Sequence, residues 1–86
     1  IQFLNQKNII HKRLLLARKK ANLSQQQLAA KLQTMGVSID QQAISKIEKN
    51  ARIVTDYEVV CLCRALTIEE SWLLGGIEEL ENLPGE

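Results

Sequence analysis

The sequence predicts an all-α fold, a compact bundle of five helices that forms one small domain. Hydrophobic residues make up 45% of the chain but aromatic residues only 3%, and its 86 residues include a single proline. The apolar residues also recur at helical spacing between residues that cap helices well. A chain of this length can bury one modest core and is too small for most enzymes.

The first helix is expected over residues 8–21. Its core candidates recur along one side of the helix: Ile10, Leu14, Leu15 and Ala17. The second helix is expected to begin at Gln25, because Ser24 and Gln27 form a capping box that satisfies two backbone N–H groups at a helix start. Gly36 suits the position after its end, where a positive φ costs glycine little.

The third helix is expected to start at Asp40, a residue type that caps helices well. Ala43, Ile44 and Ile47 form its buried stripe. Its outer face carries polar side chains: Gln41, Gln42, Ser45, Lys46 and Lys49. Glutamine can bind adenine bidentately in the major groove of DNA, and lysine can donate to guanine or phosphate. Taken alone, however, this face is better explained as the solvated side of an ordinary bundle helix.

The fourth helix is expected to start at a second capping box, formed by Thr55 and Glu58, and to run through Leu66. A fifth helix over residues 69–74 is expected to close the core and to end at two glycines. Its core residues are Trp72 and Leu73.

The chain is expected to divide into an N-terminal extension (residues 1–7), a helical domain (residues 8–76) and an acidic tail (residues 77–86). Ile77, Leu80 and Leu83 recur every third residue, so the tail either adds a helical turn or frays. No apolar run approaches the ~20 residues that cross a membrane, and no signal peptide precedes the domain, so a cytoplasmic protein is expected. The missing initiator methionine suggests a trimmed sequence.

The net charge of +1 conceals a strong asymmetry along the chain. Residues 1–54 hold ten Lys/Arg and two Asp/Glu, a net charge of +8. Residues 55–86 hold one Arg and eight Asp/Glu, a net charge of −7. An alternative is that these charges merely keep helices soluble, which explains the basic run at residues 18–20 better than it explains the whole division. A basic half that contains the third helix is what attraction to phosphate would require.

Residues 13–75, about three quarters of the chain, resemble the phage repressor and Cro family of helix-turn-helix proteins, also called the Xre family. The motifs behind this resemblance are Arg13 and Arg18, Leu23-Ser24-Gln25, Leu28-Ala29, Ile44-Ser45-Lys46-Ile47-Glu48, Arg52, Ala65-Leu66 and Trp72-Leu73-Leu74-Gly75. The resemblance implies a five-helix domain of the lambda-repressor type that binds double-stranded DNA.

The resemblance also implies roles for individual residues. Gln25 would anchor the start of the second helix to a phosphate, and Arg52 would contact the DNA backbone. The side chains expected to reach base edges are Gln41, Gln42 and Lys46. The full predicted DNA-binding set is Gln25, Gln41, Gln42, Ser45, Lys46, Lys49 and Arg52. Arg18 and Glu48 match a structural ion pair that joins the first helix to the third.

Two features depart from the shortest members of the family. Residues 33–39 lengthen the link between the second and third helices, as in a longer-turn subgroup, and this changes how the two helices dock. Asn50 stands where many members have glycine, a mild change because asparagine tolerates left-handed geometry.

No catalytic centre, cofactor or metal site is expected. Cys61 and Cys63 lie two residues apart in a predicted helix, so their side chains point about 200° apart, and His11 alone cannot complete a set of metal ligands. The predicted function is a sequence-specific DNA-binding regulator of transcription, a repressor that acts as a homodimer on a palindromic operator. The alternative is a protein-interaction or antitoxin-like module that binds a protein partner through its acidic C-terminal half.

Overall fold

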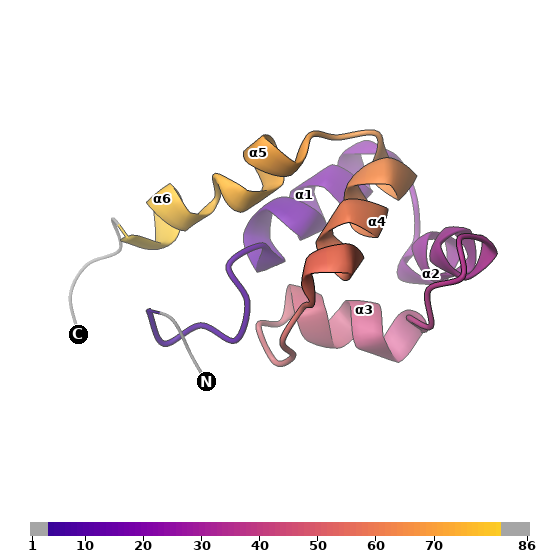
Figure 1. Ribbon diagram of the computed structural model, residues 1–86, viewed down its shortest axis with the longest axis horizontal. Helices are drawn as coiled ribbons and strands as arrows, with labels where there is room; N and C mark the ends of the chain where they lie inside the picture. Colours follow the sequence, from indigo (N-terminus) through magenta and orange to yellow (C-terminus); the bar gives the residue numbers. More distant parts are fainter. Residues whose placement is uncertain (1–3, 82–86) are drawn as a thin grey trace.

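The computed structural model describes residues 4–81, and this part of the chain folds into a bundle of helices (Figure 1). The helices are α1 (His11–Lys20), α2 (Gln25–Thr34), α3 (Gln41–Glu48), α4 (Asp56–Leu66), α5 (Glu70–Leu74) and α6 (Ile77–Glu81). The predicted all-α class is therefore confirmed, with a short sixth helix added. No helix among these is long and apolar enough to span a bilayer.

The packing of the bundle centres on α3 and α4. α3 packs against α1 and α2, and α4 packs against α2 and α5. In Figure 1, α2 lies at one end of the molecule and α6 at the other, while α3 runs along the edge opposite α5. This arrangement leaves one long side of α3 without a covering helix.

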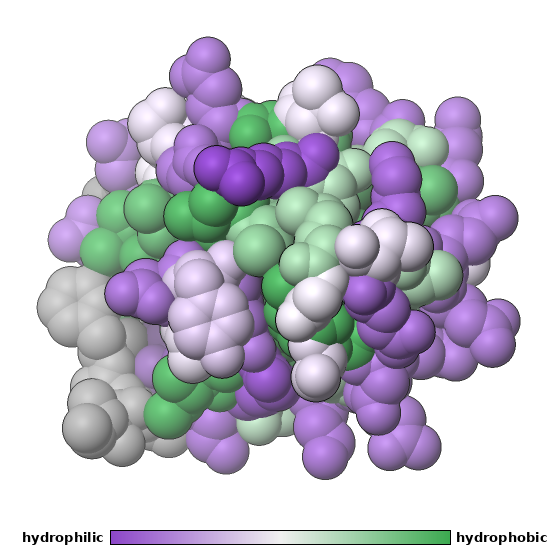
Figure 2. All heavy atoms as spheres, turned by 45° about the vertical axis from the view of Figure 1, so that its right-hand side comes forward, coloured by the Kyte–Doolittle hydropathy of each residue, from purple (hydrophilic) through white to green (hydrophobic). Residues whose placement is uncertain are grey.

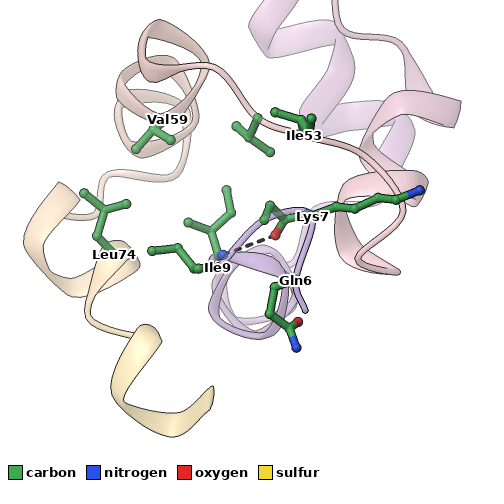
Figure 3. A pocket seen from close by; sticks show the side chains of 9 residues that line it. Gln6, Lys7, Ile9, Ile53, Val59 and Leu74 are labelled. Atoms are coloured by element: carbon green, nitrogen blue, oxygen red, sulfur yellow. Dashed lines mark hydrogen bonds between the residues drawn. The ribbon is translucent and has the colours of Figure 1, made fainter. Parts of the chain in front are cut away.

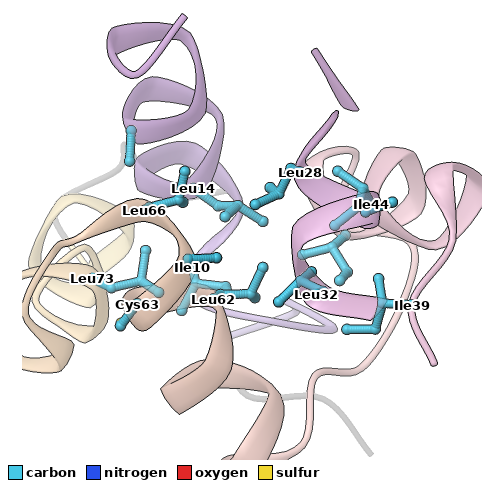
Figure 4. Close-up of a cluster of buried hydrophobic side chains, with 14 of the residues drawn as sticks. Ile10, Leu14, Leu28, Leu32, Ile39, Ile44, Leu62, Cys63, Leu66 and Leu73 are labelled. Carbon is cyan, nitrogen blue, oxygen red and sulfur yellow. The ribbon is translucent and has the colours of Figure 1, made fainter. Parts of the chain in front are cut away.

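The core collects apolar side chains from α1 through α5 (Figure 4). Eight of these residues are completely buried: Leu14, Leu28, Leu32, Ile39, Ile44, Ile47, Leu62 and Leu73. Burying a side chain of this size contributes about 1.5–3 kcal/mol. The helix-turn-helix segment therefore shares one continuous core with the rest of the bundle.

α1 begins at His11, three residues later than expected from the sequence. Asn8 explains the difference, because its side chain ties the start of α1 to a distant segment. Its Oδ1 accepts a hydrogen bond from the backbone N–H of Ile10, and its Nδ2 donates to the carbonyls of Ile47 and Arg52. Asn8 thus serves as a tertiary bridge and does not continue the helix.

The predicted start of α2 is confirmed. The Ser24 hydroxyl accepts from the backbone N–H of Gln27 at 3.0 Å, and the Gln27 side chain accepts from the backbone N–H of Ser24 at 2.8 Å. Beyond the helix, Gly36 has a φ of +83°, where an L side chain would be strained. Both ends of α2 therefore follow from local residue chemistry.

The starts of α3 and α4 are also confirmed. The Asp40 carboxylate accepts from the backbone N–H of Ala43 at 2.8 Å, and the Glu58 carboxylate accepts from that of Thr55 at 2.9 Å. Each bond satisfies a donor that a helix or its flanking residue would otherwise leave unpaired.

The C-terminal helices differ from the expectation at one core residue. Leu73 is fully buried, but Trp72 is 37% exposed and its ring lies 5.1 Å from the Arg13 guanidinium, so the prediction that Trp72 closes the core was wrong. Trp72 instead packs beside a charged side chain at the surface, a favourable cation–π geometry. In the tail, residues 77–81 form α6 with Leu80 buried, whereas Leu83 lies outside the described residues.

Candidate nucleic-acid interface

α3 has two chemically different faces. Ile44 and Ile47 are fully buried on the inner face, and the Asp40 cap fixes where the helix begins. Four side chains on the outer face and at the end of the helix are exposed: Gln41, Gln42, Lys46 and Lys49. Ser45 is half-buried between them. The helix therefore presents amide and ammonium groups from a backbone that the core holds in place.

A buried ion pair holds α3 against α1. Arg18 donates from Nε to Glu48 Oε2 at 2.6 Å and from Nη2 to Oε1 at 3.1 Å, and its Nη1 donates to the Leu23 carbonyl at 2.9 Å. The two charged side chains are only 12% and 5% exposed. This is the pair that the family resemblance implied, and it connects the end of α3 to the segment that precedes α2.

Gln25 joins the same cluster. It is half-buried at the start of α2, and its Nε2 donates to Glu48 Oε1 at 2.9 Å. The family resemblance implied a phosphate contact for Gln25 and gave no sign of this intramolecular bond. The amide nitrogen keeps a second N–H that is not needed by Glu48.

Arg52, after the end of α3, is bound to Glu58 of α4. Its two terminal nitrogens donate to the two carboxylate oxygens, each at 3.0 Å, with side-chain exposures of 29% and 7%. The hydrogen bonds from Arg52 hold the pKa of Glu58 below its usual range despite the opposing effect of burial, and the bond to Glu58 raises the pKa of Arg52. Arg52 is therefore fixed in position, but a carboxylate offsets its charge.

A shallow hollow brings part of the predicted set together. Gln42, Lys46 and Arg52 line it, although the Asp40 carboxylate lies at the same site and adds negative charge. The residues around the hollow are Asp40, Gln42, Ala43, Lys46, Ala51 and Arg52. Gln25 is absent from this group and lies beside Glu48.

The N-terminal segment contacts the end of α3, which no motif in the sequence predicted. Asn50 has a φ of +59°, and its Oδ1 accepts from the backbone N–H groups of Lys7 at 2.9 Å and Asn8 at 3.2 Å. Its Nδ2 donates to Gln6 Oε1 at 2.7 Å. The only signal in the sequence was an asparagine where glycine would satisfy the backbone, since asparagine adds an amide that can bind another segment.

His11 completes this network. Its Nε2 lies 2.9 Å from Gln6 Oε1, which already accepts from Asn50 and therefore acts as an acceptor. Nε2 must then carry the hydrogen, since the other partner offers none. Burial, and next the charge of Lys12, lower the pKa of His11, so the neutral ring is favoured.

Both cysteines of the described residues are free thiols on α4. Burial, and next the charge of Glu70, raise the pKa of Cys63 to about 11, so its thiol stays protonated at neutral pH. Cys61 is half-buried on the same helix. Within residues 4–81 no group of three or more His, Cys, Asp or Glu side chains could hold a metal ion.

The exposed positions of α2 are mostly polar, namely Gln26, Gln27, Lys31, Gln33 and Thr34. In Figure 2, which brings the α2 side of Figure 1 forward, hydrophilic side chains dominate the outer edge and hydrophobic atoms appear in patches between them.

A family model described as helix-turn-helix matches residues 14–73. The match begins within α1, contains all of α2, α3 and α4, and ends within α5. No curated protein and no solved structure matches the chain.

Proposed function

Since this chain belongs to the Xre, or lambda-repressor-like, helix-turn-helix family, whose members bind DNA, we propose that it is a sequence-specific regulator of transcription. The observation that carries the proposal is the polar outer face of α3, where Gln41 and Gln42 are exposed while Ile44 and Ile47 on the opposite face are buried. In this proposal α3 lies in the major groove of double-stranded DNA, which is wide enough to admit a helix.

In this proposal the side chains of α3 have two roles, since some contact base edges and others contact phosphate. Gln41 and Gln42 can each bind an adenine edge with two hydrogen bonds, and Lys46 can donate to guanine. Ser45, Lys49 and Arg52 lie on or after the same helix and supply further contacts to base edges or phosphate. Gln25 would use the second N–H of its amide for phosphate, while the first remains on Glu48.

The proposed working unit is a homodimer on a palindromic operator. α3 has eight residues and is therefore about 12 Å long, so a single copy can read only a few base pairs. Two copies related by a twofold axis would read two half-sites about 34 Å apart along the DNA. Repression follows if the bound dimer blocks polymerase at that site.

The test is selection of bound duplexes from a random DNA pool at ~150 mM salt, where non-specific attraction to phosphate is weakened. The variant Gln42→Ala with Lys46→Ala should relax the selected consensus, because a good bidentate pair with a base supplies about 1–3 kcal/mol of discrimination. Gln33→Ala with Lys20→Ala is the matched control, since both residues are exposed outside α3. An unchanged consensus in the α3 variant would contradict the proposal.

An alternative function is binding of a protein partner through the acidic half. The observation that favours it is a set of exposed carboxylates on and beside α5 and α6: Glu69, Glu70, Glu78 and Glu81. If the random pool yields no enriched duplex, and a basic partner protein is bound by the chain but not by the Glu69→Gln with Glu70→Gln variant, this alternative is preferred.

A further inference from the structure

We propose that the N-terminal segment, residues 6–8, is part of the DNA interface, with Lys7 as a phosphate-binding residue and Asn50 as the residue that positions it. This inference rests on the proposed function, because it assumes that α3 faces DNA. It adds a contact from a region that the sequence alone presents as an extension before the domain.

The position of Lys7 is fixed by its backbone. Asn50 follows the C-cap of α3 and holds the Lys7 N–H at 2.9 Å and the Asn8 N–H at 3.2 Å through one oxygen. The left-handed backbone at Asn50 turns its amide toward a segment more than forty residues away in the chain. Lys7 is thereby placed beside the end of α3.

A second anchor lies next to this contact. Asn8 is 8% exposed, and its Nδ2 donates to the carbonyls of Ile47 and Arg52, each at 3.0 Å. Ile47 lies in the last turn of α3 and Arg52 lies two residues after Asn50. Asn8 therefore ties the N-terminal segment to the chain on both sides of Asn50. A segment held in this way loses little conformational entropy when its side chain meets a ligand.

The segment also lines a pocket together with apolar side chains from other parts of the chain. Figure 3 shows Ile9, Val59 and Leu74 directed toward the pocket, while the Lys7 side chain extends away from Val59 and Leu74. Lys7 is exposed at this point. The ammonium group of Lys7 therefore lies away from the apolar side chains of Val59 and Leu74.

Lys7 offers a positive charge at this end of α3 that no carboxylate within residues 4–81 neutralises. Arg52 is neutralised by Glu58, whereas Lys7, Lys46 and Lys49 form no ion pair within residues 4–81. The carbonyl end of a helix carries partial negative charge, so cations are tolerated there before any phosphate arrives. A phosphate beside this end would meet the exposed ammonium group of Lys7, which no carboxylate within residues 4–81 neutralises.

The experiment measures affinity for the selected duplex as a function of salt. Lys7→Gln should lower the slope of log affinity against log salt by about 0.9, the amount expected for one phosphate contact, and should leave the selected consensus unchanged. Lys20→Gln removes the same charge from a groove formed with Leu16, Ile68 and Trp72, away from α3, and serves as the control. Lys7→Arg should retain the wild-type slope.

The variant Asn50→Gly tests whether Asn50 positions Lys7. Glycine accepts the φ of +59°, so the backbone can keep its fold, but the side-chain amide that binds residues 6–8 is removed. In this background Lys7→Gln should cause a much smaller change of slope than in the wild type. Reduced chemical acetylation of Lys7 in the complex, with Lys20 unaffected, is expected as well. Equal slopes for wild type, Lys7→Gln and Lys20→Gln would overturn the inference while DNA binding itself persists. If the wild type selects no duplex, the proposed function fails, and the inference with it.

Discussion

The bundle uses an arginine–carboxylate pair near each end of α1, and the two pairs differ sharply in burial. Arg18 and Glu48 join α1 to α3 with side-chain exposures of 12% and 5%. Arg13 and Glu79 join α1 to α6 at 3.0 Å with exposures of 23% and 53%. The first pair holds the proposed reading helix in place, whereas the second attaches a short peripheral helix.

The difference shows that the same chemistry has different consequences inside and outside the core. A charge left unpaired in a buried position cannot recover its hydration, so loss of one partner is costly. At the surface, water and salt replace a lost partner. Among the positive charges in contact with α3 or carried by it, the buried Arg18 positions the helix, whereas Lys46 and Lys49 are exposed and remain available to a ligand.

The largest effect is expected at the buried pair. Glu48→Ala should lower the free energy of unfolding by about 3 kcal/mol or more, because it leaves the Arg18 guanidinium buried without a carboxylate. Gln25 would also lose its partner. Chemical unfolding of both proteins at pH 7 measures the difference. A double variant, Arg18→Met with Glu48→Met, should be less destabilised than Glu48→Ala, since no unpaired charge remains. If Glu48→Ala lowered the free energy of unfolding by less than ~1 kcal/mol, the pair would contribute no more than an exposed ion pair does, and the prediction would be wrong.

An intermediate effect is expected at Arg52 and Glu58, the third pair. Glu58→Gln should lower stability at pH 7 by about 2 kcal/mol, since hydrogen bonds to a charged group are lost while the cap on Thr55 can persist. Arg52 holds the pKa of Glu58 below its usual 4.5, so this stabilisation is complete above pH 4.5 and is lost as the pH falls through the lowered value.

Urea unfolding at several pH values between 7 and 3 tests this assignment. The difference between wild type and Glu58→Gln should shrink toward the acidic end. A difference that stays constant over this range would mean that ionisation of Glu58 does not supply the stability.

The smallest effect is expected at the exposed pair. Glu79→Gln should change the free energy of unfolding by less than about 1 kcal/mol, since more than half of this carboxylate is exposed. Arg13 also retains its hydrogen bond to the Trp72 carbonyl at 2.6 Å and its contact with the ring. Thermal unfolding measures the change, and affinity for the selected duplex should match the wild type. If Glu79→Gln lowered the free energy of unfolding as much as Glu48→Ala does, burial would not distinguish the Arg13–Glu79 pair from the Arg18–Glu48 pair.

Much of the fold could be predicted because it depends on neighbours in the sequence. Ser24 with Gln27 and Asp40 with Ala43 are three residues apart, the spacing at which a side chain reaches a backbone N–H at a helix start. The alternation of apolar and polar residues likewise assigns Ile44 and Ile47 to the core. These patterns carry their own geometry, so no tertiary information was needed.

The candidate site was only partly predictable. The outer face of α3 follows from helical periodicity, but the intramolecular bonds of Gln25 and Arg52 do not, since they depend on how α2 and α4 lie against α3. The prediction for Trp72 failed for a related reason. An aromatic residue in a short helix can face the core or a neighbouring arginine with equal local geometry, and the position of Arg13 on α1 decides between them.

By itself, the sequence determined the helical class, the starts of α2, α3 and α4, the basic and acidic halves and the amphipathic character of α3, because each can be read from composition or from residues within a few positions of one another. Only the tertiary structure decided which charges are paired and buried, and that Asn8 and Asn50 bind Lys7 and its neighbours to the end of α3. Contacts across about forty residues depend on the whole core having assembled, and no local pattern encodes that distance.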